Sequence, residues 1–363
     1  MKKLFFVAFA AFQLWNPSFA QADGAYLDAP YPNLIKPIDD AFQNKSLLAK
    51  SDTNALIDLM TPVRSQESRG TCSIFSAAAL IEGLINLESK NSIDMDLSEE
   101  FLQFNVNAGS TSDGSYATKN FASITRDGMA SEAALPYIGS DWTSWQDSVA
   151  TKRCGYLTGT KKDSCLIVHH DPDNRYRTDE QLLDETKPWF DPDLVAARVE
   201  GREFKAMHLT QSNYGYMYST SEVKALLAKG IPVILEQDFY YGAWNHRTAD
   251  SLNIGRNLDH WSKGIVGYPF PGSMDAKQSP TKRAGHSFLI VGYDDDVVID
   301  FPVKMADGTT KTFKLKGVYY FKNSWGTDSF ARDAVIDGVS RPGYGTMIQQ
   351  YAHDYGSFYR FSL

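Results

Sequence analysis

Cysteine is scarce in this sequence, since only three of the 363 residues are cysteines, at positions 72, 154 and 165. Three are too few for a disulfide-rich scaffold, and no two of them have the spacing of a structural zinc site. The sequence also lacks a Walker loop, a GxSxG nucleophile elbow and an HExxH zinc motif. Nothing in it therefore indicates a P-loop NTPase, an α/β-hydrolase or a zinc peptidase of the HExxH type.

Basic side chains are outnumbered, with 36 Lys and Arg against 44 Asp and Glu, and the net charge is -8. Because phosphate backbones require a basic face, we do not expect nucleic acid as the main partner. Hydrophobic residues make up 43% of the chain and charged residues 22%, which excludes wholesale disorder. Beyond the N-terminus, no apolar run approaches the roughly 20 residues that span a bilayer.

The first 20 residues have the pattern of a secretory signal peptide. The basic pair Lys2-Lys3 precedes an apolar run over 4–12, and the small-x-small end at 18–20 suits cleavage before Gln21. We therefore expect an exported protein, secreted or periplasmic, with no membrane span after signal removal.

Export places the cysteines in an oxidising compartment, where disulfides persist. Cys154 and Cys165 lie close together in a polar stretch and can pair across a short loop. This pairing leaves Cys72 without a partner. A lone thiol in such a protein is either buried and inert or reactive, and composition alone does not decide between the two.

Apolar periodicity predicts helices in the first part of the chain. In "CSIFSAAALIEGLINLE" apolar residues recur at i, i+3 and i+4 and cover most of the surface, which predicts a central buried helix beginning at Cys72. A second helix should begin at Ser98, which has the capping pattern "SEEF". Further helical patterns cover 53–60 and 117–126.

Strand patterns dominate the last part. Polar stretches cover 138–218 and 245–283, and between them "SEVKALLAKG" predicts a capped helix ending at Gly230. Strands are predicted in "IPVILEQDF", "HSFLIVGYD", "VVIDFPVKM", "KTFKLKGVYYFKN", "GYGTMIQQYA" and "SFYRFSL", with an Asp-Gly hairpin turn in "ADGTT". Helices first and strands last predict the α+β class.

Four residues have the chemistry of a thiol nucleophile, its base, the residue that orients the base, and an oxyanion donor. Cys72 lies where a helix begins, which favours thiolate over thiol, and Gln66 is placed to form an oxyanion hole with the Cys72 N–H. His286 begins an apolar strand and can act as base. Asn323 ends another strand and can orient that imidazole. Alone, each has a structural interpretation, but together they favour catalysis.

Five segments, in this order, resemble the papain-like cysteine peptidases. They are "TPVRSQESRGTCSIFSA", "DLSEEFLQF", "GHSFLIVGYD", "FKNSWG" and "PGYGTMI". The resemblance implies that Cys72 is the nucleophile, His286 its general base and acid, and Asn323 the residue that orients His286. It implies that Gln66 is the oxyanion donor and that Trp325 shields the His–Asn hydrogen bond from water.

The resemblance also implies a fold of two subdomains, one helical and one antiparallel and β-barrel-like, with the cleft between them. Gly114, in "SDGSY", loosely matches the segment whose backbone pairs with substrate. No cofactor is implied. Two positions depart from the family pattern, because Arg69 replaces a half-cystine and Ser73 replaces an aromatic residue.

We expect one peptidase unit, acting as a monomer on peptide or protein substrates. Its predicted segments are a signal peptide (1–20), a lead-in or short propiece (21–60) and a peptidase domain (61–363) with a helical part (61–137), an insertion (138–218) and a strand-rich part (219–363). Two alternatives stay open, an acyltransferase that uses the same thioester and a non-catalytic binding protein on a peptidase scaffold. His169 and His170, near two aspartates, are expected in a solvated loop rather than a metal site.

Overall fold

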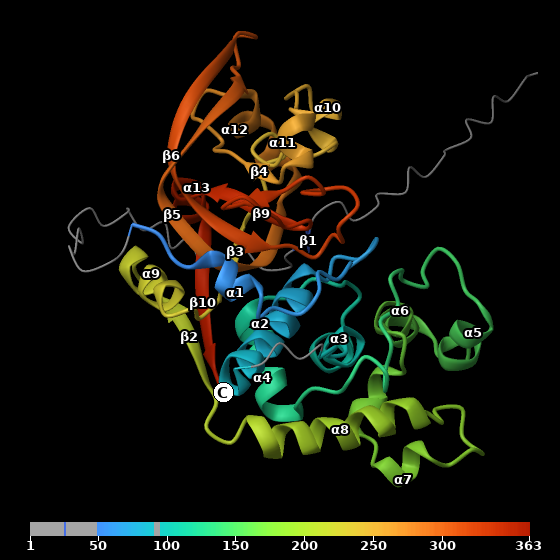
Figure 1. The fold of residues 1–363 in the computed structure, drawn as a ribbon. Coiled ribbons are helices and arrows are strands. Elements are labelled where there is room, and N and C mark those ends of the chain that lie inside the picture. Colours follow the sequence, from blue (N-terminus) through green and yellow to red (C-terminus); the bar gives the residue numbers. More distant parts are fainter. Residues whose placement is uncertain (1–24, 27–48, 91–94) are drawn as a thin grey trace, which may run out of the picture.

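The computed structural model describes residues 25–26, 49–90 and 95–363. The predicted signal peptide and most of the predicted lead-in therefore lie outside the described residues. Figure 1 shows a helical part beside a strand-rich part, with the helices drawn from the first half of the sequence and most strands from the second. This order confirms the predicted α+β class.

The central helix α2 (Cys72–Ser89) is buried over most of its length and begins at the predicted residue. Its apolar side chains join one core with residues of the sheet, such as Ile234 and Leu289. Within the described chain, α2 also has the length and composition of a membrane-crossing helix, but most of it is enclosed by protein. The continuous apolar surface therefore reflects packing on several sides.

Other helices of the first part also follow the sequence patterns. The Ser98 side chain accepts a hydrogen bond from the Phe101 backbone N–H and so caps α3. The predicted segments over 53–60, from Ser98 and over 117–126 correspond to α1 (Thr53–Ile57), α3 (Glu99–Asn107) and α4 (Ala117–Asp127).

The polar insertion is largely helical, which its sequence did not indicate. The elements are α5 (Ser148–Cys154), α6 (Gly159–Val168), η2 (Pro172–Tyr176), α7 (Asp179–Leu182) and α8 (Pro192–His208). Their burial is uneven. In α8, Leu194 and Ala197 are fully buried while most neighbours are polar, whereas the end of α6, from Ser164 to Val168, is entirely buried. A disulfide between Cys154 and Cys165 joins α5 to α6.

We expect the double variant Cys154→Ala/Cys165→Ala to lose about 2–4 kcal/mol of unfolding free energy, because the disulfide restricts the unfolded chain. Chemical denaturation followed by circular dichroism measures this loss. A non-reducing peptide map of the wild-type protein in which the two cysteines are not cross-linked would contradict the prediction.

One eight-stranded sheet organises the second part. The strands follow the order β2 (Asn213–Met217), β10 (Gly356–Ser362), β3 (Val233–Asp238), β5 (Ala284–Lys304), β6 (Thr310–Lys322), β9 (Tyr344–Ile348) and β4 (Ile265–Val266), and β1 (Ala25–Tyr26) pairs with the start of β5. All pairs are antiparallel except β4 with β9.

Two strand predictions differ from the structure. The segments "HSFLIVGYD" and "VVIDFPVKM" form the single long strand β5, which is irregular between Asp294 and Val298. The segment "GYGTMIQQYA" is strand only as far as Ile348 and continues as α13 (Gln349–Tyr355). The predicted Asp-Gly hairpin joins β5 to β6, with Gly308 at φ +86°.

Short elements fill the connections of the strand-rich part. They are α9 (Thr220–Ala228), α10 (Thr248–Ser251), α11 (Leu258–Ser262), α12 (Met274–Gln278), η3 (Ser279–Lys282), β7 (Val335–Ile336) and β8 (Val339–Ser340). Of these, α9 is the helix predicted in "SEVKALLAKG", but its cap is Ser219 rather than Ser221 at the start of that segment, and Ser219 forms a capping box with Glu222.

Candidate active site

Cys72 is the first residue of α2 and the one free cysteine of the described chain. The preceding Thr71 makes no capping hydrogen bond through its side chain; its hydroxyl instead bonds the Tyr137 hydroxyl at 2.7 Å. The start of α2 is therefore held by a tertiary contact rather than by a local cap.

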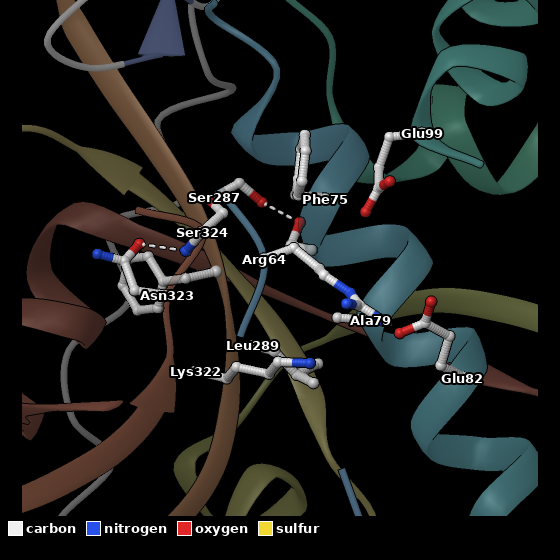
Figure 2. A pocket seen from close by; sticks show the side chains of 12 residues that line it. Arg64, Phe75, Ala79, Glu82, Glu99, Ser287, Leu289, Lys322, Asn323 and Ser324 are labelled. Carbon is white, nitrogen blue, oxygen red and sulfur yellow. Dashed lines mark hydrogen bonds between the residues drawn. The ribbon is translucent and has the colours of Figure 1, made fainter. Parts of the chain in front are cut away.

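The N-terminus of α2 packs directly on β5 beside His286. Ser76, one turn after Cys72, hydrogen-bonds through its hydroxyl to the hydroxyl of Ser287 at 2.7 Å. The backbone of Ser287 also hydrogen-bonds the Cys72 thiol. Figure 2 shows the Ser287 hydroxyl hydrogen-bonded toward this helix. The structure thus brings together the two segments that carry the predicted nucleophile and base.

His286 and Asn323 form the predicted hydrogen bond. The His286 Nε2 donates to the Asn323 Oδ1 at 2.8 Å, and the Ser324 backbone N–H donates to the same oxygen at 2.9 Å (Figure 2 shows the second contact). Because Nε2 carries the proton in this arrangement, Nδ1 is the unprotonated nitrogen of a neutral ring. In the described chain this buried Nδ1 has no hydrogen-bond partner, so it is available to accept a proton.

Aromatic rings enclose His286. Trp325 stacks on the imidazole with ring centroids 4.6 Å apart and an interplanar angle of 22°. Trp244 and Phe239 approach it edge-on at 5.2 and 6.0 Å. Rings at these distances exclude water from the His–Asn hydrogen bond. Trp325 was predicted for this place, whereas Trp244 and Phe239 were not, and the only sequence signal for them is the aromatic-rich "FYYGAW" after β3.

Burial sets the electrostatics of the reacting pair. Cys72 and His286 are both 0% exposed. Burial raises the pKa of the Cys72 thiol well above its usual value, although backbone hydrogen bonds from Ser287 and Ser73 oppose the rise. Burial lowers the pKa of His286 to about 3, against the hydrogen bond to Asn323. Burial therefore favours the neutral form of both groups, in opposition to the helix N-terminus, which favours the thiolate.

Gln66 is held at both ends of its side-chain amide. Its Nε2 donates to the Arg69 carbonyl at 2.7 Å, and its Oε1 accepts from the Ser324 hydroxyl at 2.7 Å. Its backbone N–H also donates to the Ser324 carbonyl at 2.8 Å. An amide nitrogen has two hydrogens, so one remains for a further acceptor. Because Ser324 directly follows Asn323, these contacts link Gln66 to the segment that carries Asn323. The sequence did not indicate this role of Ser324.

Arg69 is fully buried and forms an ion cluster where the family pattern has a half-cystine. Its guanidinium donates to Asp113 at 2.7 Å and to Glu100 at 3.0 Å. It also donates to the carbonyls of Ile138 at 3.0 Å and Ile167 at 2.7 Å. Because the Arg69 carbonyl accepts from Gln66, this cluster fixes the loop that leads to the nucleophile.

The remaining predicted residues lie near this cluster. Gly114 is buried between α3 and α4 and directly follows Asp113, and its contact with substrate stays a prediction. The solvated loop expected for His169 and His170 is wrong, since both are fully buried. Their Nδ1 atoms hydrogen-bond the carboxylates of Glu100 and Asp191, each at 2.7 Å. The described residues include no group of three or more His, Cys, Asp or Glu side chains that could hold a metal ion.

Comparisons with known proteins find similarity to cysteine proteases. The sequence model described as "Papain family cysteine protease" matches residues 49–206. Cysteine proteinase 1 of Entamoeba histolytica is 34% identical over 91 residues, which are 24% of this chain and only 29% of that protein. The matched segment therefore spans less than a third of this relative.

Solved structures show the fold. The chain is similar to xylellain, a cysteine protease from Xylella fastidiosa, with a TM-score of 0.50 and 17% identity over 93% of this chain and 95% of the other. The digestive procathepsin L2 of Tenebrio molitor gives a TM-score of 0.48 and 18% identity over 94% and 80%. At 17% identity, the likeness to xylellain is one of fold, and it covers most of the chain.

Proposed function

We propose that this chain is a papain-like cysteine peptidase that hydrolyses peptide bonds through a thioester on Cys72, and the match of residues 49–206 to the papain family model supports the proposal. The observation that carries the proposal is the His286–Asn323 hydrogen bond under Trp325, on a strand packed against the helix that begins with Cys72. A structural histidine would not require this combination of partners.

In the proposed reaction, the His286 Nδ1 accepts the thiol proton as the Cys72 sulfur attacks the peptide carbonyl. The backbone N–H of Cys72 and the remaining amide hydrogen of Gln66 stabilise the resulting oxyanion. The tetrahedral intermediate collapses to the thioester while His286 returns its proton to the leaving amine. Water then attacks the thioester with His286 as base, which releases the acid and restores the thiol.

The segment assignments remain part of the proposal. Residues 1–20 direct export to a secreted or periplasmic location, 21–60 form a lead-in or short propiece, and 61–363 form a monomeric peptidase unit acting on peptides or proteins. Support for the lead-in comes from β1, whose Ala25 pairs with Gly285, the residue before His286. Deleting 21–48 is expected to speed alkylation of Cys72, measured by mass spectrometry. Slower alkylation of Cys72 in the deletion variant would contradict the proposal that the lead-in covers the site.

Asn323→Ala is expected to lower kcat by about 10–100-fold with little change in KM, because it removes the orientation of a general base rather than the base itself. Steady-state kinetics on a peptide substrate measures both constants. Asn323→Asp, which keeps an acceptor for Nε2, should lose less. A kcat equal to wild type in Asn323→Ala would remove this residue from the site.

Titration of the native protein with a thiol reagent, alongside hydrolysis of a broad peptide library, tests the proposal as a whole. We expect labelling at Cys72 that requires the native fold and that abolishes hydrolysis. Labelling without any hydrolysis would favour the acyltransferase or the binding protein instead. Product analysis with an added amine separates those two, since only an acyltransferase forms the amide.

A further inference from the structure

A large cavity opens on the helical part, among the ends of α3 and α4, the segment around η2, and α8. Its volume is about 1110 Å³. In Figure 1, α8 runs along the side of the helical part that faces away from the sheet. Basic side chains dominate the lining of the cavity: Arg126, Arg175, Arg177, Arg198, Arg202 and Lys205. Only Asp127 and Asp179 are acidic, although the whole chain has a net charge of -8.

The helix α8 supplies three of these cations from one face. Arg198, Arg202 and Lys205 are separated by four and three residues, a spacing that places side chains on the same side of a helix. Arg175 belongs to η2, within the insertion, and Arg126 ends α4 of the helical part. The cavity therefore exists only because the insertion folds against the helical part.

Backbone carbonyls position these cations without neutralising them. Arg198 donates to the carbonyls of Arg177 and Asn174 at 2.9 and 2.6 Å. Lys205 donates to the carbonyl of Arg126 at 2.9 Å. A carbonyl carries no net charge, so these contacts orient the side chains and leave their positive charge in place.

Carboxylates compensate only part of the charge. Arg198 and Arg202 share Asp179, at 3.5 and 2.8 Å. Arg126 pairs with Asp127 at 2.5 Å and Arg177 with Asp171 at 2.9 Å. Burial lowers the pKa of Arg198, and the neighbouring charge of Arg202 lowers it further. Among the described residues, no carboxylate lies within ion-pair distance of Arg175 or Lys205. The cavity thus holds like charges close together, an arrangement that an anion would stabilise.

We propose that this cavity binds an oligoanion that carries phosphate-type groups. Each phosphate has up to two charges and three acceptor oxygens, so a compact ligand with a few groups can neutralise the excess within one cavity. Guanidinium groups bind such oxygens in pairs. Tyr176, which is 73% exposed and has the Arg175 guanidinium 4.5 Å from its ring centre, provides an apolar face at the same cavity.

Calorimetric titration of the full protein with inorganic tripolyphosphate tests the proposal. We expect saturable binding that weakens as salt is added. Arg202→Gln/Lys205→Gln should weaken it at least about tenfold, since two charge-assisted contacts are lost. The matched control, Lys314→Gln/Lys316→Gln, removes the same charge from the exposed β6 and should bind like wild type.

Equal weakening in both double variants would overturn the site, because only net charge would then matter. Absence of wild-type binding at millimolar tripolyphosphate would also overturn it, as would tighter binding of an oligoglutamate peptide. Co-sedimentation with vesicles that contain phosphatidylglycerol distinguishes the source of the phosphate. Sedimentation that Arg202→Gln/Lys205→Gln reduces assigns a lipid headgroup, and tripolyphosphate binding alone assigns a soluble oligoanion. None of these readouts depends on peptide hydrolysis.

Discussion

Replacing Cys72 by alanine is expected to abolish peptide hydrolysis, with kcat falling by about 10⁴–10⁶-fold, as when the nucleophile of a catalytic triad is removed. The physical reason is that Cys72 is the one free thiol among the described residues, because Cys154 and Cys165 are joined in a disulfide. Hydrolysis of a peptide substrate by purified wild type and variant measures the loss. Undiminished hydrolysis by Cys72→Ala would overturn the proposed function.

A neighbouring substitution supplies the control. Ser73 is also buried at the start of α2, and its hydroxyl has no hydrogen-bond partner among the described residues. Ser73→Ala therefore disturbs the same turn of the helix without removing a proposed catalytic group. We expect it to fold normally and to keep kcat within a few-fold of wild type, since it removes no transition-state contact. Equal inactivation of both variants would assign the loss to the helix start rather than to the thiol.

Replacing Arg69 by methionine is expected to lower the free energy of unfolding by about 3–5 kcal/mol, because buried Glu100 and partly buried Asp113 would lose the cation between them. The loss should extend to kcat. The Arg69 carbonyl orients the Gln66 amide, and a displaced loop would misplace an oxyanion donor. Denaturant unfolding and steady-state kinetics on the same samples measure the two effects.

Two comparisons sharpen this prediction. Arg69→Lys keeps the charge but cannot reach all the acceptors that the planar guanidinium bonds, so we expect an intermediate loss. Arg332→Met breaks an exposed ion pair with Asp333 and should change the unfolding free energy by less than about 1 kcal/mol. If Arg69→Met unfolds at the same denaturant concentration as wild type, the cluster does not stabilise the fold.

Several features were predictable because they depend on neighbouring residues. Apolar periodicity located α2, the Ser98 side chain marked the start of α3, and Asp307-Gly308 marked the β5–β6 hairpin. The insertion was less predictable. In α8, for example, few positions are buried and most of the sequence is polar, so the apolar residues show no clear helical periodicity. "GYGTMIQQYA" became partly helical because α13 packs Tyr351 and Ala352 into the core of the strand-rich part.

The sequence by itself indicated the resemblance to papain-like peptidases, the fold class and the identity of the proposed reacting groups, because their motifs are short and occur in the order of that family. Only the tertiary structure decided their environment. The side chain of Arg69 bonds those of Glu100 and Asp113, which come from later segments of the chain. The ring of Trp244, from the segment after β3, packs against His286. Burial favours the neutral forms of Cys72 and His286, because solvation depends on everything packed around a group rather than on its neighbours in sequence.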